Sequence, residues 1–203
     1  MNRKLAILLS LLTVTLLGAC ATYRPNGPPM ATRAEIAELE QGLLDLGPGI
    51  DPEEARRAAR ITYEYTYQLA QEYQITDPPL IHNMKVNAGL RPRGLCWQWA
   101  EDIEARLKQE NFKTLVLFRA IANADSRILI DHSTAILSRR GDTMEQGVVI
   151  DPWRYGGVLF WSPLLEDTRY TWVPRMVVLN KRAAERGYIR TDPSSEPLPA
   201  SGS

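Results

Sequence analysis

Residues 94–103 read GLCWQWAEDI and place a single cysteine between a glycine and two tryptophans. From this cysteine onward, apolar residues recur at helical spacing on one face, namely Cys96, Trp99, Ala100, Ile103 and Leu107. The spacing predicts a helix over residues 96–107 that begins at the cysteine. A helix N-terminus stabilises a thiolate, because unpaired N–H groups and the helix dipole point toward it. Cys96 is therefore a candidate nucleophile as well as a candidate core residue.

The N-terminus has the features of a bacterial secretion signal. Arg3 and Lys4 precede an apolar run over residues 5–17, which is shorter than the ~20 residues that span a bilayer. The run ends in Leu-Gly-Ala-Cys at residues 17–20, which resembles the lipobox of bacterial lipoproteins. The resemblance implies that residues 1–19 are removed and that lipidated Cys20 anchors the protein in the cell envelope. Ala21, in place of aspartate, favours the outer membrane, facing the periplasm.

The cysteine count bears on the role of Cys96. The chain has two cysteines, and acylation of Cys20 leaves Cys96 without a partner for an intramolecular disulfide. An unpaired thiol in an oxidising compartment is a liability unless it is buried or chemically employed.

Composition limits the domain organisation and the partners. Residues 20–33 are rich in Pro, Gly and Thr and predict a flexible tether, while residues 191–203 predict a disordered tail, so one domain is expected over residues 34–190. The 24 basic and 24 acidic residues form no long run of one sign, which argues against nucleic acid as a partner. Neither metal-ligand spacing nor a phosphate-binding glycine loop is present, so no cofactor is expected.

Helical patterns precede strand patterns along the chain. Helices are predicted over residues 34–46 and 51–73, the second with an Asp51 N-cap before Pro52, and a proline-broken loop follows near residue 78. Runs rich in Val, Ile, Leu and Thr predict strands at 113–119, 127–139 and 146–153, with more strand after residue 157 and helical composition at 181–186. This order predicts the α+β class.

A catalytic thiol needs a base, and the chain has two histidines, His82 and His132. His82 is the weaker candidate, because it lies in the predicted loop with no carboxylate placed beside it. His132 is expected to share a strand face with Ile128, Ile130, Thr134 and Ile136. If residues 141–142 form a two-residue hairpin turn, His132 lies directly opposite Asp151, which would accept a hydrogen bond from the imidazole. The alternative to the two-residue turn is a longer loop. The alternative to a catalytic His132 is a core histidine whose ring is satisfied by another hydrogen bond.

The cysteine motif is similar to that of a known family. Residues 94–100, GLCWQWA, resemble the transglutaminase nucleophile motif Gly-Gln-Cys-Trp-Val-Phe-Ala. The strands that carry His132 and Asp151 are similar to the histidine and aspartate strands of that family, in the same order. The resemblance covers residues 93–153. It implies a papain-like fold in which the cysteine helix packs on an antiparallel sheet.

The resemblance also implies a mechanism and the residues of a cleft. Cys96 would attack an amide carbonyl, His132 would accept and return the proton, and Asp151 would fix the imidazole tautomer. Trp97 and Trp153 are expected to line the cleft, whereas Trp99 is expected in the core. No glutamine stands upstream where papain-type enzymes place their oxyanion donor, so Asn87 is considered for that role.

Three functions compete at this point. The first is a membrane-anchored enzyme that cleaves or crosslinks peptide amides of envelope peptides or proteins through a thioester. The second is a catalytically inactive scaffold or binding lipoprotein that keeps the same fold. The third is a cysteine peptidase acting on peptidoglycan stem peptides, but such enzymes usually have histidine as the third catalytic residue, and Asp151 does not match.

Overall fold

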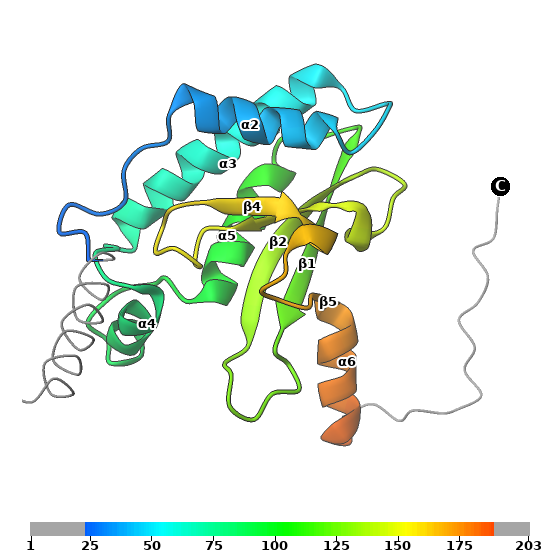
Figure 1. Cartoon of the computed structure of the whole chain (residues 1–203). Helices are drawn as coiled ribbons and strands as arrows, with labels where there is room; N and C mark the ends of the chain where they lie inside the picture. Colours follow the sequence, from blue (N-terminus) through cyan, green and yellow to red (C-terminus); the bar gives the residue numbers. More distant parts are fainter. Residues whose placement is uncertain (1–22, 189–203) are drawn as a thin grey trace, which may run out of the picture.

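The structure is a computed structural model that describes residues 23–188 (Figure 1). The predicted signal peptide, the lipidation site Cys20 and the predicted tail lie outside these residues. Within residues 23–188, no helix is both long enough and apolar enough to cross a membrane.

Four helices come first in the described chain. They are α2 (Arg33–Leu44), α3 (Pro52–Glu72), α4 (Pro79–Asn87) and α5 (Cys96–Lys108). The side chain of Thr32 caps α2 and that of Asp51 caps α3, where it accepts a hydrogen bond from the Glu53 N–H at 2.8 Å. Helix α5 begins at Cys96, as its apolar spacing predicts.

The remaining elements form one antiparallel sheet and a final helix. The strands are β1 (Leu115–Ala122), β2 (His132–Arg139), β3 (Val148–Asp151), β4 (Phe160–Pro163) and β5 (Val173–Pro174), followed by α6 (Arg175–Glu185). Their order in the sheet is β4-β3-β2-β1-β5, and every neighbouring pair is antiparallel. The predicted α+β class is confirmed.

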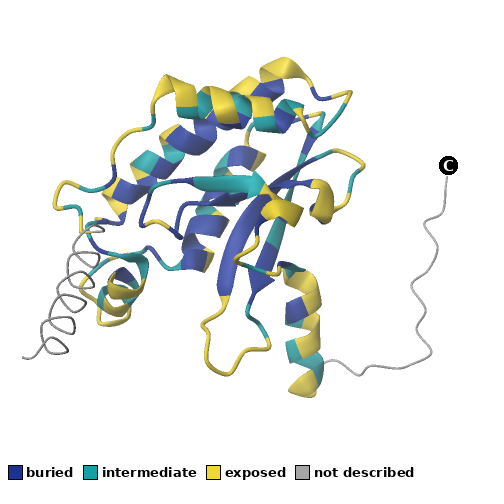
Figure 2. Cartoon of the chain, in the orientation of Figure 1, coloured by how far each residue is buried: buried dark blue, intermediate teal, exposed yellow. Residues whose placement is uncertain are grey.

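The sheet separates two apolar clusters. On one face α5 packs chiefly on β2, α3 packs on α5, and α2 covers α3 (Figure 1). The main core fills this side, and Figure 2 shows the buried strands and the buried faces of these helices meeting there. Trp99 belongs to this core, where its ring meets the ring of Tyr73 edge-on. A smaller cluster around Ile136, Val149 and Trp172 covers the other face.

Two sequence predictions about local structure are wrong. The prolines at 78 and 79 do not leave a loop but begin α4, because a first-turn proline lacks only an N–H that has no helical partner anyway. The strand predicted over residues 127–139 begins only at His132. Before it, Ser126 Oγ accepts hydrogen bonds from the Ile128 and Leu129 N–H groups, which satisfies the backbone locally instead of in a ladder.

The predicted tether also needs correction. The Arg24 N–H donates to the Thr76 carbonyl at 2.9 Å, and its guanidinium donates to the Tyr155 carbonyl at 3.1 Å. Pro28 is buried, and Thr32 already caps α2. The segment from Arg24 to Thr32 is therefore part of the domain, because side-chain and backbone contacts fix a stretch whose composition alone is typical of a linker.

Candidate active site

The turn before α5 positions Cys96. The Gln98 side chain folds back, and its Oε1 accepts hydrogen bonds from the N–H groups of Gly94 and Leu95 at 2.9 and 3.0 Å. This is half of a capping box, since leucine at the N-cap has no oxygen to return the bond. Among the described residues, the Cys96 N–H has no hydrogen-bond partner, as is normal for a first helical residue.

His82 supports this turn instead of acting beside the thiol. Its ring is buried, and its Nε2 lies 2.8 Å from the Arg93 carbonyl oxygen. Burial lowers the pKa of His82. The ring also packs against the Cα of Gly94, where a Cβ would overlap with Nε2.

Gly94→Ala should therefore lower the free energy of unfolding by about 1–3 kcal/mol. Gly94 has a φ of +125°, which alanine adopts only under strain, and the added Cβ would clash with His82. Urea unfolding followed by tryptophan fluorescence measures the loss. Gly89→Ala is the matched control, because Gly89 also has a positive φ of +73° but open space around its Cα. Equal losses in the two variants would contradict the role given to the His82 contact.

The His132 imidazole is hydrogen-bonded to Asp151. Nε2 of the ring lies 2.7 Å from Asp151 Oδ2, and both side chains are 1% exposed. The predicted register is wrong: Ala135 pairs with Ile150, and a 3-10 turn (Met144–Gln146) lengthens the connection between β2 and β3. This shifts Asp151 by two residues relative to His132. An even shift keeps a residue on the same face, so the two side chains meet diagonally.

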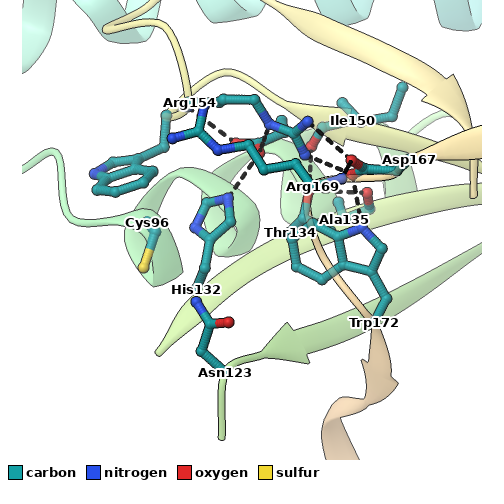
Figure 3. Close-up of polar contacts among 12 residues, drawn as sticks. Cys96, Asn123, His132, Thr134, Ala135, Ile150, Arg154, Asp167, Arg169 and Trp172 are labelled. Carbon is teal, nitrogen blue, oxygen red and sulfur yellow. Dashed lines mark hydrogen bonds and ion pairs between the residues drawn. The ribbon is translucent and has the colours of Figure 1, made fainter. Parts of the chain in front are cut away.

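Cys96 lies on the other side of the imidazole. Figure 3 shows the thiol beside the ring, away from the dashed hydrogen bond to Asp151. Among the described residues, the buried Nδ1 of His132 has no hydrogen-bond partner. The Cys96 S–H instead donates to the Asp131 carbonyl, with an S···O distance of 3.5 Å. Nδ1 is therefore the ring nitrogen that can exchange a proton with the thiol.

The surroundings of His132 set its charge. The ring centroid lies 4.6 Å from those of Trp153 and Tyr170 and 5.3 Å from that of Trp172. This burial by itself lowers the pKa of His132, but the hydrogen bond and charge of Asp151, helped by Cys96, more than compensate and raise the pKa to about 9. The ring therefore stays protonated at neutral pH.

A buried ion network behind Asp151 has no counterpart in the sequence predictions. Arg154 Nε lies 2.9 Å from Asp151 Oδ2, and Arg154 Nη2 lies 2.6 Å from Asp167 Oδ2. The Trp172 indole N–H also donates to Asp167, at 2.9 Å. Figure 3 labels Arg154, Asp167 and Trp172 of this network. The only sequence signal was an arginine three residues after Asp151, and nothing local pointed to Asp167.

The other predicted site residues differ in placement. Trp153 lines a cavity beside His132, and its indole N–H donates to Asn83 Oδ1 at 3.0 Å. Trp97 is 46% exposed, and neither it nor Asn87 is among the residues that line this cavity. Asn87 lies exposed at the end of α4, one helical turn beyond Asn83, so the structure does not bring it to the site.

Within residues 23–188, no group of three or more His, Cys, Asp or Glu side chains is arranged to hold a metal ion. Comparisons with family models, with curated proteins and with solved structures found no match for this chain.

Proposed function

We propose that this protein is a lipid-anchored cysteine enzyme of the bacterial cell envelope, with a transglutaminase-like, papain-like core that acts on peptide amides. The observation that carries the proposal is the order Cys96, His132, Asp151 around one imidazole. Its Nε2 is held by the carboxylate, and its Nδ1, on the side of the thiol, has no hydrogen-bond partner within residues 23–188. The lipobox at residues 17–20 supports the anchor and the envelope location.

Acylation uses the two ring nitrogens differently. The raised pKa of His132 favours a pair in which the Cys96 proton already resides on Nδ1, and the thiolate of this pair bonds to the substrate carbonyl carbon, whose π electrons move to oxygen. The free Cys96 N–H at the start of α5 is the backbone donor for that oxyanion. When the carbonyl re-forms, the C–N bond breaks, and the leaving amine takes the proton from Nδ1. A thioester on Cys96 remains.

Deacylation runs the same proton transfers in reverse. Water, or the amine of a second peptide, gives a proton to His132 Nδ1 as it attacks the thioester, and the sulfur departs as a thiolate, which restores the thiolate–imidazolium pair. Water yields a peptidase or amidase, whereas an amine yields a crosslinking transamidase. Asp151 keeps the Nε2–H oriented throughout and stabilises the imidazolium.

A non-catalytic scaffold is the second candidate function, and one observation favours it. The Cys96 side chain is buried, and its S–H is directed to the Asp131 carbonyl rather than to His132. For catalysis, the thiol must leave that carbonyl, because a thiolate cannot donate a hydrogen bond to it. A scaffold would retain this contact permanently.

Alkylation of Cys96 at different pH values tests the proposal without knowledge of the substrate. The imidazolium attracts anionic iodoacetate but not neutral iodoacetamide. The ratio of their rate constants should therefore be high at neutral pH and fall as pH rises through about 9, where His132 loses its proton. Mass spectrometry of the mature lipoprotein identifies the labelled residue.

Cys96→Ala is the control and should abolish labelling, because the mature chain has no other free thiol. A ratio that does not change between pH 6 and pH 10 would favour the scaffold. So would a Cys96 that reacts no faster with iodoacetamide than a free cysteine in a peptide.

A further inference from the structure

An apolar cavity of about 590 Å³ opens beside His132. Its walls come from three parts of the chain: the start of α4, the β1–β2 loop, and the segments that follow β3 and β4. The apolar lining residues include Pro79, Ile81, Leu129, Ile130, Trp153 and Tyr170. A volume of this size is within the range of small-molecule and side-chain binding sites.

The cavity begins one side chain away from the reacting groups. Trp153 and Tyr170 line it, and both rings pack on the His132 imidazole at centroid distances of 4.6 Å. Cys96 lies beside the same imidazole (Figure 3). A substrate that reaches the thiol can therefore place a neighbouring group in the cavity.

The walls are apolar although they are open to solvent. Leu80 is 58% exposed on the α4 side, and Leu129 is 60% exposed on the side of the β1–β2 loop. Apolar side chains gathered around one concave surface indicate an occupant that is itself apolar.

Hydrogen bonds within the chain hold the β1–β2 loop in place. Asn123 Nδ2 donates to the Ile130 carbonyl at 3.2 Å. From α6, Arg182 donates to the Asp131 carboxylate at 2.6 and 2.9 Å and to the Ala124 carbonyl at 2.9 Å. The wall is therefore preorganised, which reduces the entropy lost on binding.

The cation Arg169 lines the cavity. The Arg154 guanidinium is already paired with two carboxylates, whereas Arg169 forms no ion pair among the described residues and packs on the Tyr170 ring at 5.5 Å. Arg169 therefore repels a basic side chain that approaches the cavity and tolerates a neutral or acidic one.

We infer that the cavity binds a bulky apolar side chain next to the amide that Cys96 attacks, and that Arg169 discriminates against peptides with a basic residue there. This rests on the proposed function and names the class of its substrate. The cavity residues determine specificity, because they contact a side chain of the substrate and not the amide bond that breaks.

Peptidyl vinyl sulfones that differ only in the residue beside the electrophile test the inference. Each rate constant for labelling Cys96 in the mature lipoprotein is divided by the rate constant for iodoacetamide in the same preparation. Probes with Phe or Leu should react at least about tenfold faster than the probe with Asn, and the probe with Lys should be slowest. Arg169→Gln should bring the Lys probe up to the Asn probe.

Leu129→Asn and Ile81→Asn, from opposite walls, should each reduce the preference for Phe over Asn several-fold. Leu165→Asn is the matched control, because Leu165 is 78% exposed but does not line the cavity. It should leave the preference unchanged. Fast iodoacetamide labelling with equal rates for all the peptidyl probes would overturn this inference alone. A thiol that reacts slowly with every reagent would overturn the proposed function as well.

Discussion

Arg154→Met is expected to destabilise the fold by about 3–5 kcal/mol, the typical loss when one partner of a buried ion pair is removed. The Arg154 side chain is 2% exposed, and its guanidinium lies between the carboxylates of Asp151 and Asp167. Without it, two buried negative charges remain with too few donors. Urea unfolding at neutral pH measures the effect.

Two further variants separate this explanation from a loss of packing. Arg154→Met combined with Asp167→Asn should recover part of the stability, since the double change removes a charge that the single change leaves unpaired. Arg56→Met removes an exposed pair with Glu53 on α3 and should leave the unfolding midpoint unchanged. If the double variant were no more stable than Arg154→Met, lost packing would explain the effect instead.

The same network makes the stability depend on acid. Burial alone would raise the pKa of Asp167, but the hydrogen bonds from Arg154 and Trp172 outweigh burial and lower the pKa below its ordinary value of 3.8. A carboxyl group with a lowered pKa stabilises the fold above that ordinary value. This contribution is lost as pH falls below 3.8, so the destabilisation by Arg154→Met should shrink in acid.

Asp151→Asn is expected to have the largest effect on the thiol chemistry. The neutral amide can still accept hydrogen bonds from Arg154, so the variant should fold. The amide carries no negative charge, so it no longer offsets the lowering of the His132 pKa by burial. The pH at which the iodoacetate-to-iodoacetamide ratio falls should therefore move from about 9 to near the ordinary imidazole value of 6.5 or below.

Turnover of any amide or thioester substrate should fall by about 10²–10⁴-fold in the same variant, the usual contribution of a positioned acid–base group. Asp125→Asn changes an exposed carboxylate that pairs with Lys181 and serves as the control. An inflection that stayed near pH 9 in Asp151→Asn would show that Asp151 does not set the charge of His132.

Local patterns were sufficient for the starts of α3 and α5 and for the shared face of His132 and Asp151. The apolar spacing after Cys96 predicted the start and the buried face of α5. This prediction is local, because the apolar face of a helix turns toward the protein core wherever the helix lies in the fold. Asp51 before Pro52 predicted the start of α3, because an N-cap side chain bonds only to backbone N–H groups of the first helical turn. The strand alternation that placed His132 and Asp151 on one face remained valid when the register shifted, because the shift was even.

The remaining features depend on contacts between segments that are distant in the sequence. Residues 128–130 have a strand-like composition, but they form no ladder because Asn123 and Ser126 bond the loop to itself. Arg154 pairs with Asp167 only because the chain after β4 returns beside β2. The same return packs the rings of Tyr170 and Trp172 on His132. Sequence periodicity reports only which face of an element is apolar. By itself, the sequence therefore determined the helix that begins at Cys96 and the residue types of the candidate site, whereas the tertiary structure alone decided which charges and rings surround the imidazole.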